Sequence, residues 1–202
     1  MAEADKVISD LLRQVLDEYG GRISIDGGSK VLVSDVNIAN ALSDLTKAIR
    51  TPFGPKITVA ARSSSGQDSA ELPPNTISKP ADNLEFDHYS HAVFGIISED
   101  PKFIFGGLKA MITAMAPKGV AVVISLKQES RQVEGQEDSF SMALEDKMTY
   151  QSKGKIQKLT DVLEYAGFER GKIRSFERSS NASGEKVDAE VVLAMKWDQL
   201  SA

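Results

Sequence analysis

The feature that most constrains the fold is an alternation of helical and strand patterns in the N-terminal part of the chain. Apolar residues recur at helical spacing over residues 7–19 and again over 38–49. A short, β-branched apolar run follows each of them, at 30–33 and at 56–61. Strands that are separated by helices usually pair in parallel. This order therefore predicts a parallel sheet with helical crossovers.

Glycine, proline and capping residues indicate where the predicted elements end. Gly20 and Gly21 are expected to end an N-terminal helix at residues 1–20, since glycine readily adopts the left-handed conformation that closes helices. Ser34 or Asp35 can cap the next helix. Further along we expect a strand at 88–97, a helix at 101–115, a strand at 120–126 after the turn at 117–119, a helix at 156–166, and a β-hairpin formed by 172–178 and 189–196.

The whole chain, 1–202, is predicted to form a single α/β domain. Residues 63–85 are rich in Ser, Pro, Gly, Asn and Asp and are expected to form a flexible loop, within which 75–79 can hold a short strand. Residues 127–153 are polar and form a candidate lid, with a helical pattern at 141–148. We interpret both segments as excursions from one domain.

Composition argues against several kinds of site. The sequence contains no cysteine, which excludes disulfides, thiol nucleophiles and cysteine-bound zinc, and two histidines without clustered acids do not support a metal site. The formal net charge of −5 disfavours binding to nucleic acid. No apolar run is long enough to cross a bilayer and the N-terminus does not resemble a signal peptide. We therefore expect a cytoplasmic protein without membrane contact.

Three segments in the C-terminal part of the chain carry a family resemblance. The run FDHYSHAVFGIISEDP, which begins at Phe86, is followed by a helical pattern, the turn MAPKG and the strand VAVVISL, and VLEYAGF ends at Phe168. These segments resemble the fourth strand, the fifth unit and the passage into the terminal hairpin of class I S-adenosylmethionine-dependent methyltransferases. The resemblance implies a Rossmann-like, mostly parallel seven-stranded sheet with a C-terminal antiparallel β-hairpin.

The cofactor-binding half departs from the family pattern. The family has a glycine-rich turn after its first strand, because only glycine lets the backbone approach the cofactor closely. The matching residues here, Val33 to Asn40, include no glycine. The family also places a carboxylate at the end of the second strand, where it accepts both ribose hydroxyls, whereas this chain has Ala61, Arg62 and Ser63. Both anchors for the nucleoside are therefore expected to be missing.

Two other interpretations of these departures stay open. The segment ISIDGG, at residues 23–28, also ends a short apolar run in an acid and two glycines, although another strand rather than a helix follows it. Alternatively, the chain is a genuine methyltransferase that binds S-adenosylmethionine through an unusual turn. Which segment would form the cofactor-binding turn therefore stays open at this point.

The carboxyl ends of parallel strands are where ligands bind in such sheets, and this rule selects the candidate site residues. His91 is the catalytic candidate, placed by the resemblance near the carboxyl end of its strand, because an imidazole titrates near neutrality and can polarise a carbonyl. The alternative for His91 is a structural histidine with a backbone partner. The candidate substrate-binding residues are Asp35, Asn37, Asn40, Arg62, Phe94 and Lys127.

The leading functional hypothesis is a methyltransferase-like protein that has lost S-adenosylmethionine binding and been repurposed. By analogy with members of the superfamily in specialised metabolism, it would be a cofactor-independent cyclase or isomerase of the pericyclase type acting on a small apolar metabolite. The alternatives are a genuine small-molecule methyltransferase that uses S-adenosylmethionine and a non-catalytic pseudo-methyltransferase that serves as a binding or scaffold subunit. A homodimer is compatible with each of them.

Overall fold

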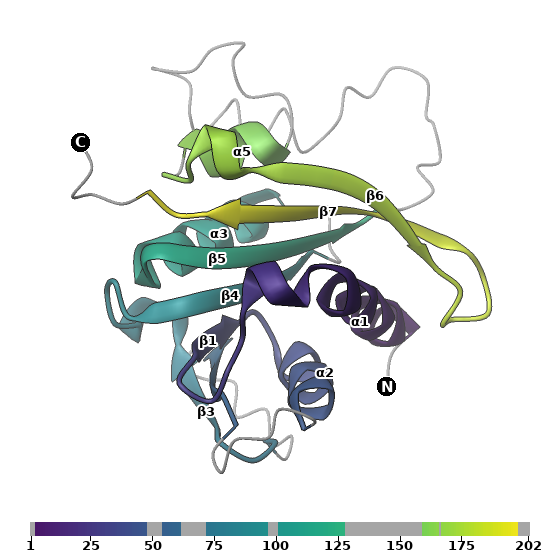
Figure 1. Cartoon of the computed structure of the whole chain (residues 1–202), viewed down its shortest axis with the longest axis horizontal. Helices are drawn as coiled ribbons and strands as arrows, with labels where there is room; N and C mark the ends of the chain where they lie inside the picture. The colour runs from purple at the N-terminus through teal and green to yellow at the C-terminus, as the bar shows by residue number, and fades with distance from the viewer. Residues whose placement is uncertain are drawn as a thin grey trace.

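The computed structural model describes residues 3–47, 54–61, 72–96, 101–127, 159–165 and 167–197. In these ranges seven strands form one sheet, in the order β3-β2-β1-β4-β5-β7-β6 (Figure 1). The strands are β1 (Lys30–Val33), β2 (Lys56–Ala61), β3 (Thr76–Pro80), β4 (Tyr89–Ile96), β5 (Met115–Leu126), β6 (Arg174–Ser180) and β7 (Val187–Met195). The helices are α1 (Glu3–Ile23), α2 (Val36–Thr46), α3 (Pro101–Ala114) and α5 (Leu159–Tyr165), with short 3-10 turns η1 (Ala81–Asn83) and η2 (Arg170–Lys172).

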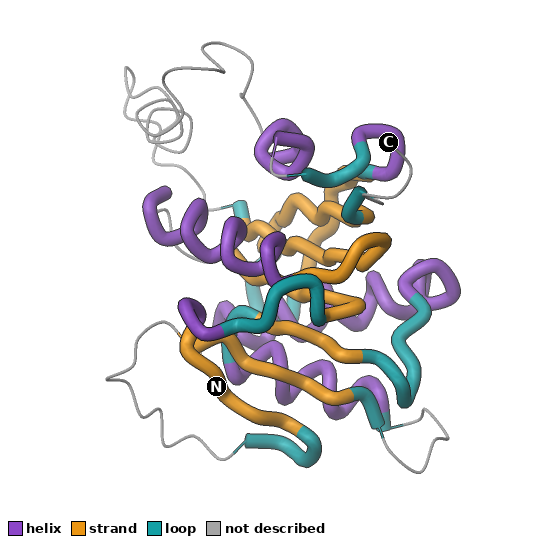
Figure 2. Tube along the Cα trace, turned by 90° about the vertical axis from the view of Figure 1, so that its left-hand side faces the viewer, coloured by secondary structure: helices purple, strands orange, loops and turns teal. Residues whose placement is uncertain are grey.

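The pairing confirms the predicted mostly parallel sheet with a C-terminal antiparallel hairpin. Strand β1 pairs in parallel with β2 and with β4, and the parallel ladder continues to β3 on one side and to β5 on the other. Strand β7 lies antiparallel between β5 and β6. Helices cover the strands on both sides (Figure 2), as alternating helices and strands require.

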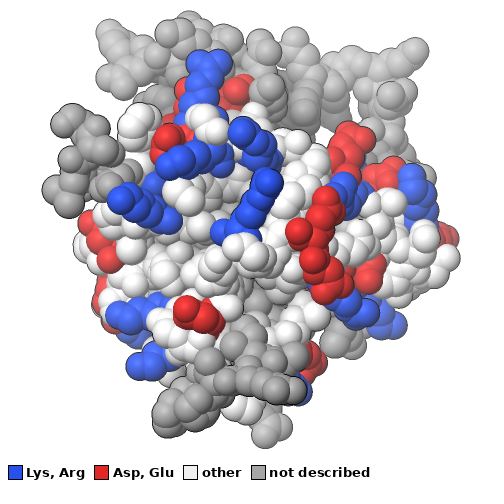
Figure 3. Space-filling model, viewed as in Figure 1, with Lys and Arg blue, Asp and Glu red and all other residues white. Residues whose placement is uncertain are grey.

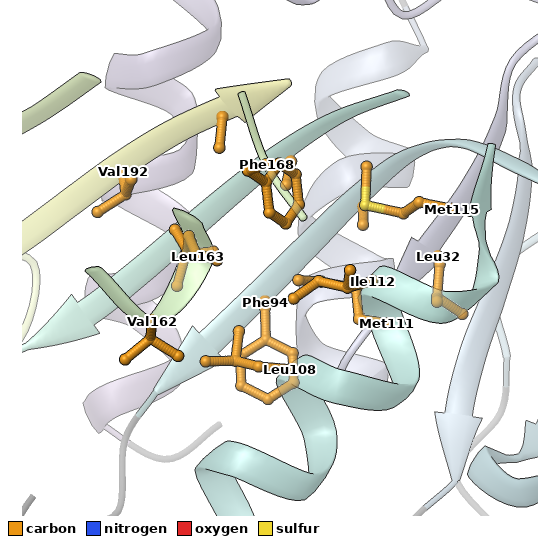
Figure 4. Close-up of a cluster of buried hydrophobic side chains, with 14 of the residues drawn as sticks. Leu32, Phe94, Leu108, Met111, Ile112, Met115, Val162, Leu163, Phe168 and Val192 are labelled. Atoms are coloured by element: carbon orange, nitrogen blue, oxygen red, sulfur yellow. The ribbon is translucent and has the colours of Figure 1, made fainter. Parts of the chain in front are cut away.

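Each face of the sheet has its own apolar core. On one face α1 and α2 pack through Leu11, Val15 and Leu42, all fully buried, against the strands. On the other face α3 and α5 contribute Leu108 and Leu163, which lie close to the strands in Figure 4. No helix within the described ranges is both long and apolar enough to span a bilayer.

The first helix is longer than the glycine pair predicted. Helix α1 continues through Gly20 and Gly21 to Ile23, and the left-handed residue that ends it is Ser24, with φ of 55°. The backbone amide of Ser24 donates to the carbonyl of Gly20 over 2.7 Å, and its hydroxyl donates to the carbonyl of Gly21 over 2.8 Å. The serine side chain thus satisfies a helix-terminal carbonyl and ends the helix in place of glycine.

Two segments were predicted to be irregular. The structure describes the second half of the first segment and one residue of the second. The predicted loop at 63–85 holds β3 and η1, so its second half is regular, while its residues up to 71 are outside the described ranges. The candidate lid at 127–153 is also outside them, apart from its first residue. Strand β5 begins directly after α3, and its residue Lys118, with φ of 62°, replaces the predicted turn.

A close approach between α3 and β4 explains a glycine inside a helix. A Cβ built on Gly107 would lie 2.6 Å from Cζ of the Phe94 ring, nearer than carbon atoms can pack. The ring of Phe94 is buried within the core on this face, beside Leu108 (Figure 4). Gly107 is therefore needed for α3 to sit on β4 at this distance.

We expect Gly107→Ala to lower the free energy of unfolding by about 1–2 kcal/mol, because overpacking a buried ring outweighs the higher helix propensity of alanine. Gly20→Ala is the matched control, since a Cβ there would meet nothing within 4 Å. That variant should gain up to about 1 kcal/mol. Chemical denaturation of both variants measures the difference. A Gly107→Ala variant as stable as the parent would contradict the close packing.

Candidate functional site

The candidate site lies where the strand order reverses. The chain leaves β1 towards β2 on one side, while β4 lies on the other side of β1. In open parallel sheets the ligand crevice lies beyond the carboxyl ends of the strands at such a point. For this protein that place is bounded by the residues after Val33 on β1 and by the end of β4 at Ile96.

Ser34 joins β1 to β4 at this point. Its backbone amide donates to the carbonyl of Val93 over 3.1 Å, and its hydroxyl oxygen accepts the amide hydrogen of Gly95 over 3.0 Å. The Ser34 hydroxyl in turn donates to Oδ2 of Asp35 over 3.1 Å. The two strands therefore stay hydrogen-bonded one residue beyond the end of β1.

Asp35 turns the chain directly from β1 into α2. Its Oδ1 accepts the amide hydrogen of Ile38 over 3.0 Å, and its extended backbone marks it as the residue before the first helical position, Val36. The carboxylate also lies at the positive end of the helix dipole. This confirms the predicted cap and leaves only Ser34 and Asp35 between the strand and the helix.

Side chains of the protein pack on both faces of the carboxyl end of β4. A Cβ built on Gly95 would lie 2.9 Å from Cδ1 of Ile38 and 3.7 Å from Cδ1 of Ile8, and both isoleucines are buried. On the opposite face Phe94, which was predicted to bind substrate, is a core residue against Gly107. Apolar residues of this chain therefore flank the strand end on both sides.

The polar groups at the switch point form one hydrogen-bond network, and the side chains beneath it are apolar. The Asp35 carboxylate accepts from the Ile38 amide and from the Ser34 hydroxyl, and the Ser34 hydroxyl accepts from the Gly95 amide. In the described part of the chain no group of three acidic or histidine side chains is placed to hold a metal ion. The network is suited to fixing the turn between β1 and α2.

His91 does not lie where the sequence placed it. It is the third residue of β4, at the amino end of the strand, and pairs in register with Val31 on β1. The expectation that it lies near the carboxyl end is therefore wrong. The apolar run after His91 forms the buried length of β4 and carries the strand on to Ile96.

Both ring nitrogens of His91 have partners in the protein. Nε2 lies 2.6 Å from the carbonyl oxygen of Ile23 at the end of α1, and Nδ1 lies 2.9 Å from the hydroxyl of Ser90. Because a carbonyl only accepts, Nε2 carries the proton in the neutral ring and Nδ1 accepts from Ser90. Burial lowers the pKa of His91, against smaller opposing effects of the Ile23 carbonyl and of Asp26. This arrangement matches a structural histidine.

The remaining predicted site residues that the structure describes, Asn37, Asn40 and Lys127, are not brought together. Asn37 and Asn40 lie half-buried on α2 after the cap. Lys127 follows β5 and forms an ion pair with Glu177 on β6, which raises the pKa of the lysine. Arg62 lies outside the described residues. Among the predicted substrate-binding residues that the structure describes, Asp35 lies at the switch point, and Phe94 is packed into the core beside it.

Sequence reasoning missed the parts played by Ser34 and Gly95. Ser34 was considered only as a cap, whereas its hydroxyl bridges β1 to β4. A glycine inside a strand is a signal of close approach, and Gly95 carried that signal. Its partner, Ile38, could not be named because it lies on a different element.

Comparison with known proteins gives a consistent answer at the level of the fold. No family model matches the sequence, and no curated protein matches it. Solved structures do match. A protein named as a sarcosine dimethylglycine methyltransferase from Galdieria sulphuraria superimposes with a TM-score of 0.56 at 14% identity, over 93% of this chain and 86% of that one.

Two further structures agree. Phosphoethanolamine N-methyltransferase 2 of Haemonchus contortus matches with a TM-score of 0.55 at 12% identity, over 92% of this chain but only 52% of that protein. A SAM-dependent methyltransferase from Methanosarcina mazei matches with a TM-score of 0.52 at 12% identity, over 91% and 97% of the two chains. This chain has the class I methyltransferase fold. At such identities the likeness concerns the fold, and function has to be argued from the site.

We expect Asp35→Ala to destabilise this methyltransferase-like domain by about 1–2 kcal/mol, since it removes the cap of α2 and the acceptor of the Ser34 hydroxyl. Asp44→Ala is the matched control on the same helix, because Asp44 is exposed and pairs with nearby Lys47. That change should stay within about 0.5 kcal/mol. Urea denaturation compares them, and equal losses would argue against the network.

We expect the stability to fall as the pH drops below the pKa of a histidine in an unfolded chain, about 6.5. Because burial lowers the pKa of His91 in the folded state, the unfolded chain binds the proton more tightly. The contribution is complete above pH 6.5 and is lost progressively below it. His91→Gln should flatten this part of the pH dependence. Identical profiles for the parent and His91→Gln would contradict the structural role.

Proposed function

We propose that this chain is a pseudo-methyltransferase: a protein that keeps the methyltransferase fold, does not bind S-adenosylmethionine at the switch point, and acts as a binding or scaffold subunit. The observation that carries the proposal is the network in which Ser34 accepts from Gly95 and donates to Asp35. These hydrogen bonds hold β1, β4 and the start of α2 together at the strand ends that would otherwise face a ligand.

The packing around the network supports the same proposal. A nucleoside cofactor in this crevice would need a backbone without side chains between β1 and α2. Here Ile38 lies over Gly95 and is itself buried, and both residues of the turn, Ser34 and Asp35, carry side chains. The side chains packed in this turn support the proposal that the cofactor does not bind here.

The second strand supports it independently. Strand β2 ends at Ala61, and the residues that follow are Arg62 and Ser63. A carboxylate that could accept the two ribose hydroxyls is thus missing from the positions directly at the end of β2. An arginine offers donors only, and cannot replace it.

A cofactor-independent cyclase or isomerase stays a prediction and is the weaker alternative. Its catalytic candidate, His91, lies at the amino end of β4 and is held by Ile23 and Ser90. Its predicted substrate contact, Phe94, is part of the core. A reaction on a small apolar metabolite would therefore need a site built from other residues.

Thermal unfolding with and without S-adenosylmethionine and S-adenosylhomocysteine tests the proposal. A ligand at a hundred times its dissociation constant adds about 2.7 kcal/mol to the free energy of unfolding, which is readily seen as a higher Tm. We expect no change in Tm with either compound up to millimolar concentration.

The controls separate a true negative from a failed assay. A methyltransferase of the same fold should show the shift under the same conditions. A saturable rise in the Tm of this chain would overturn the proposal and favour a genuine methyltransferase.

A further inference from the structure

His91 is a buried side chain that can carry a positive charge, and among the described residues the other such side chain is Lys196. The charged side chains drawn in Figure 3 gather in acidic and basic groups on the molecular surface. Nζ of Lys196 is paired with the carboxylate of Asp87 at 3.0 Å. The His91 ring instead contacts a serine hydroxyl and a backbone carbonyl. Its ability to take up a proton therefore depends mainly on these hydrogen bonds.

The Ser90 hydroxyl lies between three polar groups of two neighbouring strands. Its oxygen is 2.9 Å from Nδ1 of His91 and 3.0 Å from the backbone nitrogen of Lys30, which donates to it. The same oxygen is 3.2 Å from the carbonyl oxygen of Lys30, to which the hydroxyl can donate. Because a hydroxyl has a single proton, it donates either to the ring or to this carbonyl.

The two protonation states of His91 use this hydroxyl in opposite directions. In the neutral ring Nδ1 is an acceptor, so Ser90 donates to it and the Lys30 carbonyl lacks the serine proton. In the charged ring Nδ1 donates to the serine oxygen, which frees the hydroxyl proton for the Lys30 carbonyl. All contacts of this hydroxyl are thus hydrogen bonds at the same time only when the ring is charged.

Nε2 of His91 has the same role in both states. The carbonyl of Ile23 only accepts, and its oxygen lies 2.6 Å from Nε2, so this nitrogen donates whether the ring is neutral or charged. Ile23 is the last residue of α1, where the free carbonyls form the negative end of the helix dipole. The hydrogen bond between α1 and β4 is therefore kept on protonation and is strengthened by the positive charge.

Asp26, in the turn after α1, is the charged group that acts on the ring. Its Oδ1 accepts from the hydroxyl of Ser29 over 3.0 Å, and this hydrogen bond is the main reason why the pKa of Asp26 is lowered. The carboxylate therefore stays charged over the range in which a histidine titrates, and it favours the charged ring.

The other elements beside the ring place no opposing charge on it. The residues that pair with His91 in the sheet, Val31 on β1 and Val120 on β5, are uncharged. Lys30 adjoins Val31, and its side chain points to the opposite face because strand residues alternate. Arg22, in the last turn of α1, is exposed. Burial is thus the main effect that opposes protonation of His91.

We infer that Ser90 and His91 form a proton-binding joint between α1, β1 and β4, in which the Ser90 hydroxyl reverses its hydrogen bond when the His91 ring takes up a proton. The Ser90–His91 joint stays closed in both states, since the reversal replaces each hydrogen bond that it breaks. The fold thereby binds a proton in its interior without releasing α1 from the sheet. The inference does not depend on the loss of cofactor binding.

Nuclear magnetic resonance of isotope-labelled protein tests the joint directly, with His91→Gln to identify the His91 ring signals. As the pH is lowered from about 8 until the protein unfolds, Nε2 should stay protonated throughout and Nδ1 should gain a proton. The carbonyl carbon signal of Lys30 should shift with the same midpoint, because the Ser90 hydroxyl then donates to that carbonyl. The amide signal of Ser24, at the end of α1, should persist through the midpoint.

Variants of Ser90 test the reversal. In Ser90→Ala the charged ring would hold a buried Nδ1–H without an acceptor, which costs more than a neutral nitrogen without a donor, so the proton affinity of His91 should fall by about tenfold or more. Ser90→Thr keeps the hydroxyl on a residue that suits a strand and should titrate like the parent. Ser78→Ala, at an exposed serine on β3, is the matched control and should leave the midpoint unchanged.

Circular dichroism confirms that each variant is folded before titrations are compared, and if Ser90→Ala does not fold, the Lys30 carbonyl shift in the parent and in Ser90→Thr decides. A Ser90→Ala midpoint equal to that of the parent, a Lys30 carbonyl signal that does not follow the ring, or a ring that stays neutral until the protein unfolds would each overturn the inference. Loss of the Ser24 amide signal at the His91 midpoint would overturn it too, by showing that protonation releases α1. None of these outcomes bears on cofactor binding, because His91 lies at the amino end of β4 and the switch point at its carboxyl end.

Discussion

The hydrogen bond from the Gly95 amide to the Ser34 hydroxyl is the interaction on which the switch point depends. It joins the two central strands, and the same hydroxyl contacts the Asp35 carboxylate that starts α2. Ile38 can then cover Gly95, because the helix begins at once and runs close to the strand end. A longer, glycine-rich turn would lift α2 away and open this space. The short turn therefore sets both the packing of α2 and the chemistry left at the site.

The stability of this fold does not depend on a ligand crevice at the switch point. The two apolar cores on either face of the sheet depend on the order of strands and helices rather than on the turn after β1. Under the proposed function, the capped turn would replace a binding surface by a helix cap, which stabilises the domain. The resemblance to methyltransferases in fold and the departure from them at the switch point thus have separate physical origins.

Local signals predicted the fold well, and long-range contacts limited what could be predicted of the site. The β-branched runs of β1 and β2 and the cap at Asp35 are properties of short segments and were confirmed. The predicted end of α1 was wrong because Ser24, rather than a glycine, ends the helix, with its amide bonded to the carbonyl of Gly20 and its hydroxyl to that of Gly21. The role of His91 depended on its contact with Ile23, which lies 68 residues away in the chain. No pattern of spacing encodes such a contact.

The most direct test of the closed switch point is the hydrogen exchange of the Gly95 amide, measured by NMR with and without saturating S-adenosylhomocysteine. Because this amide is buried and bonded to Ser34, its exchange should require global unfolding, and the ligand should change neither its rate nor its chemical shift. Fast exchange in the free protein, together with protection on adding the ligand, would show an open crevice that binds the cofactor and would contradict the account.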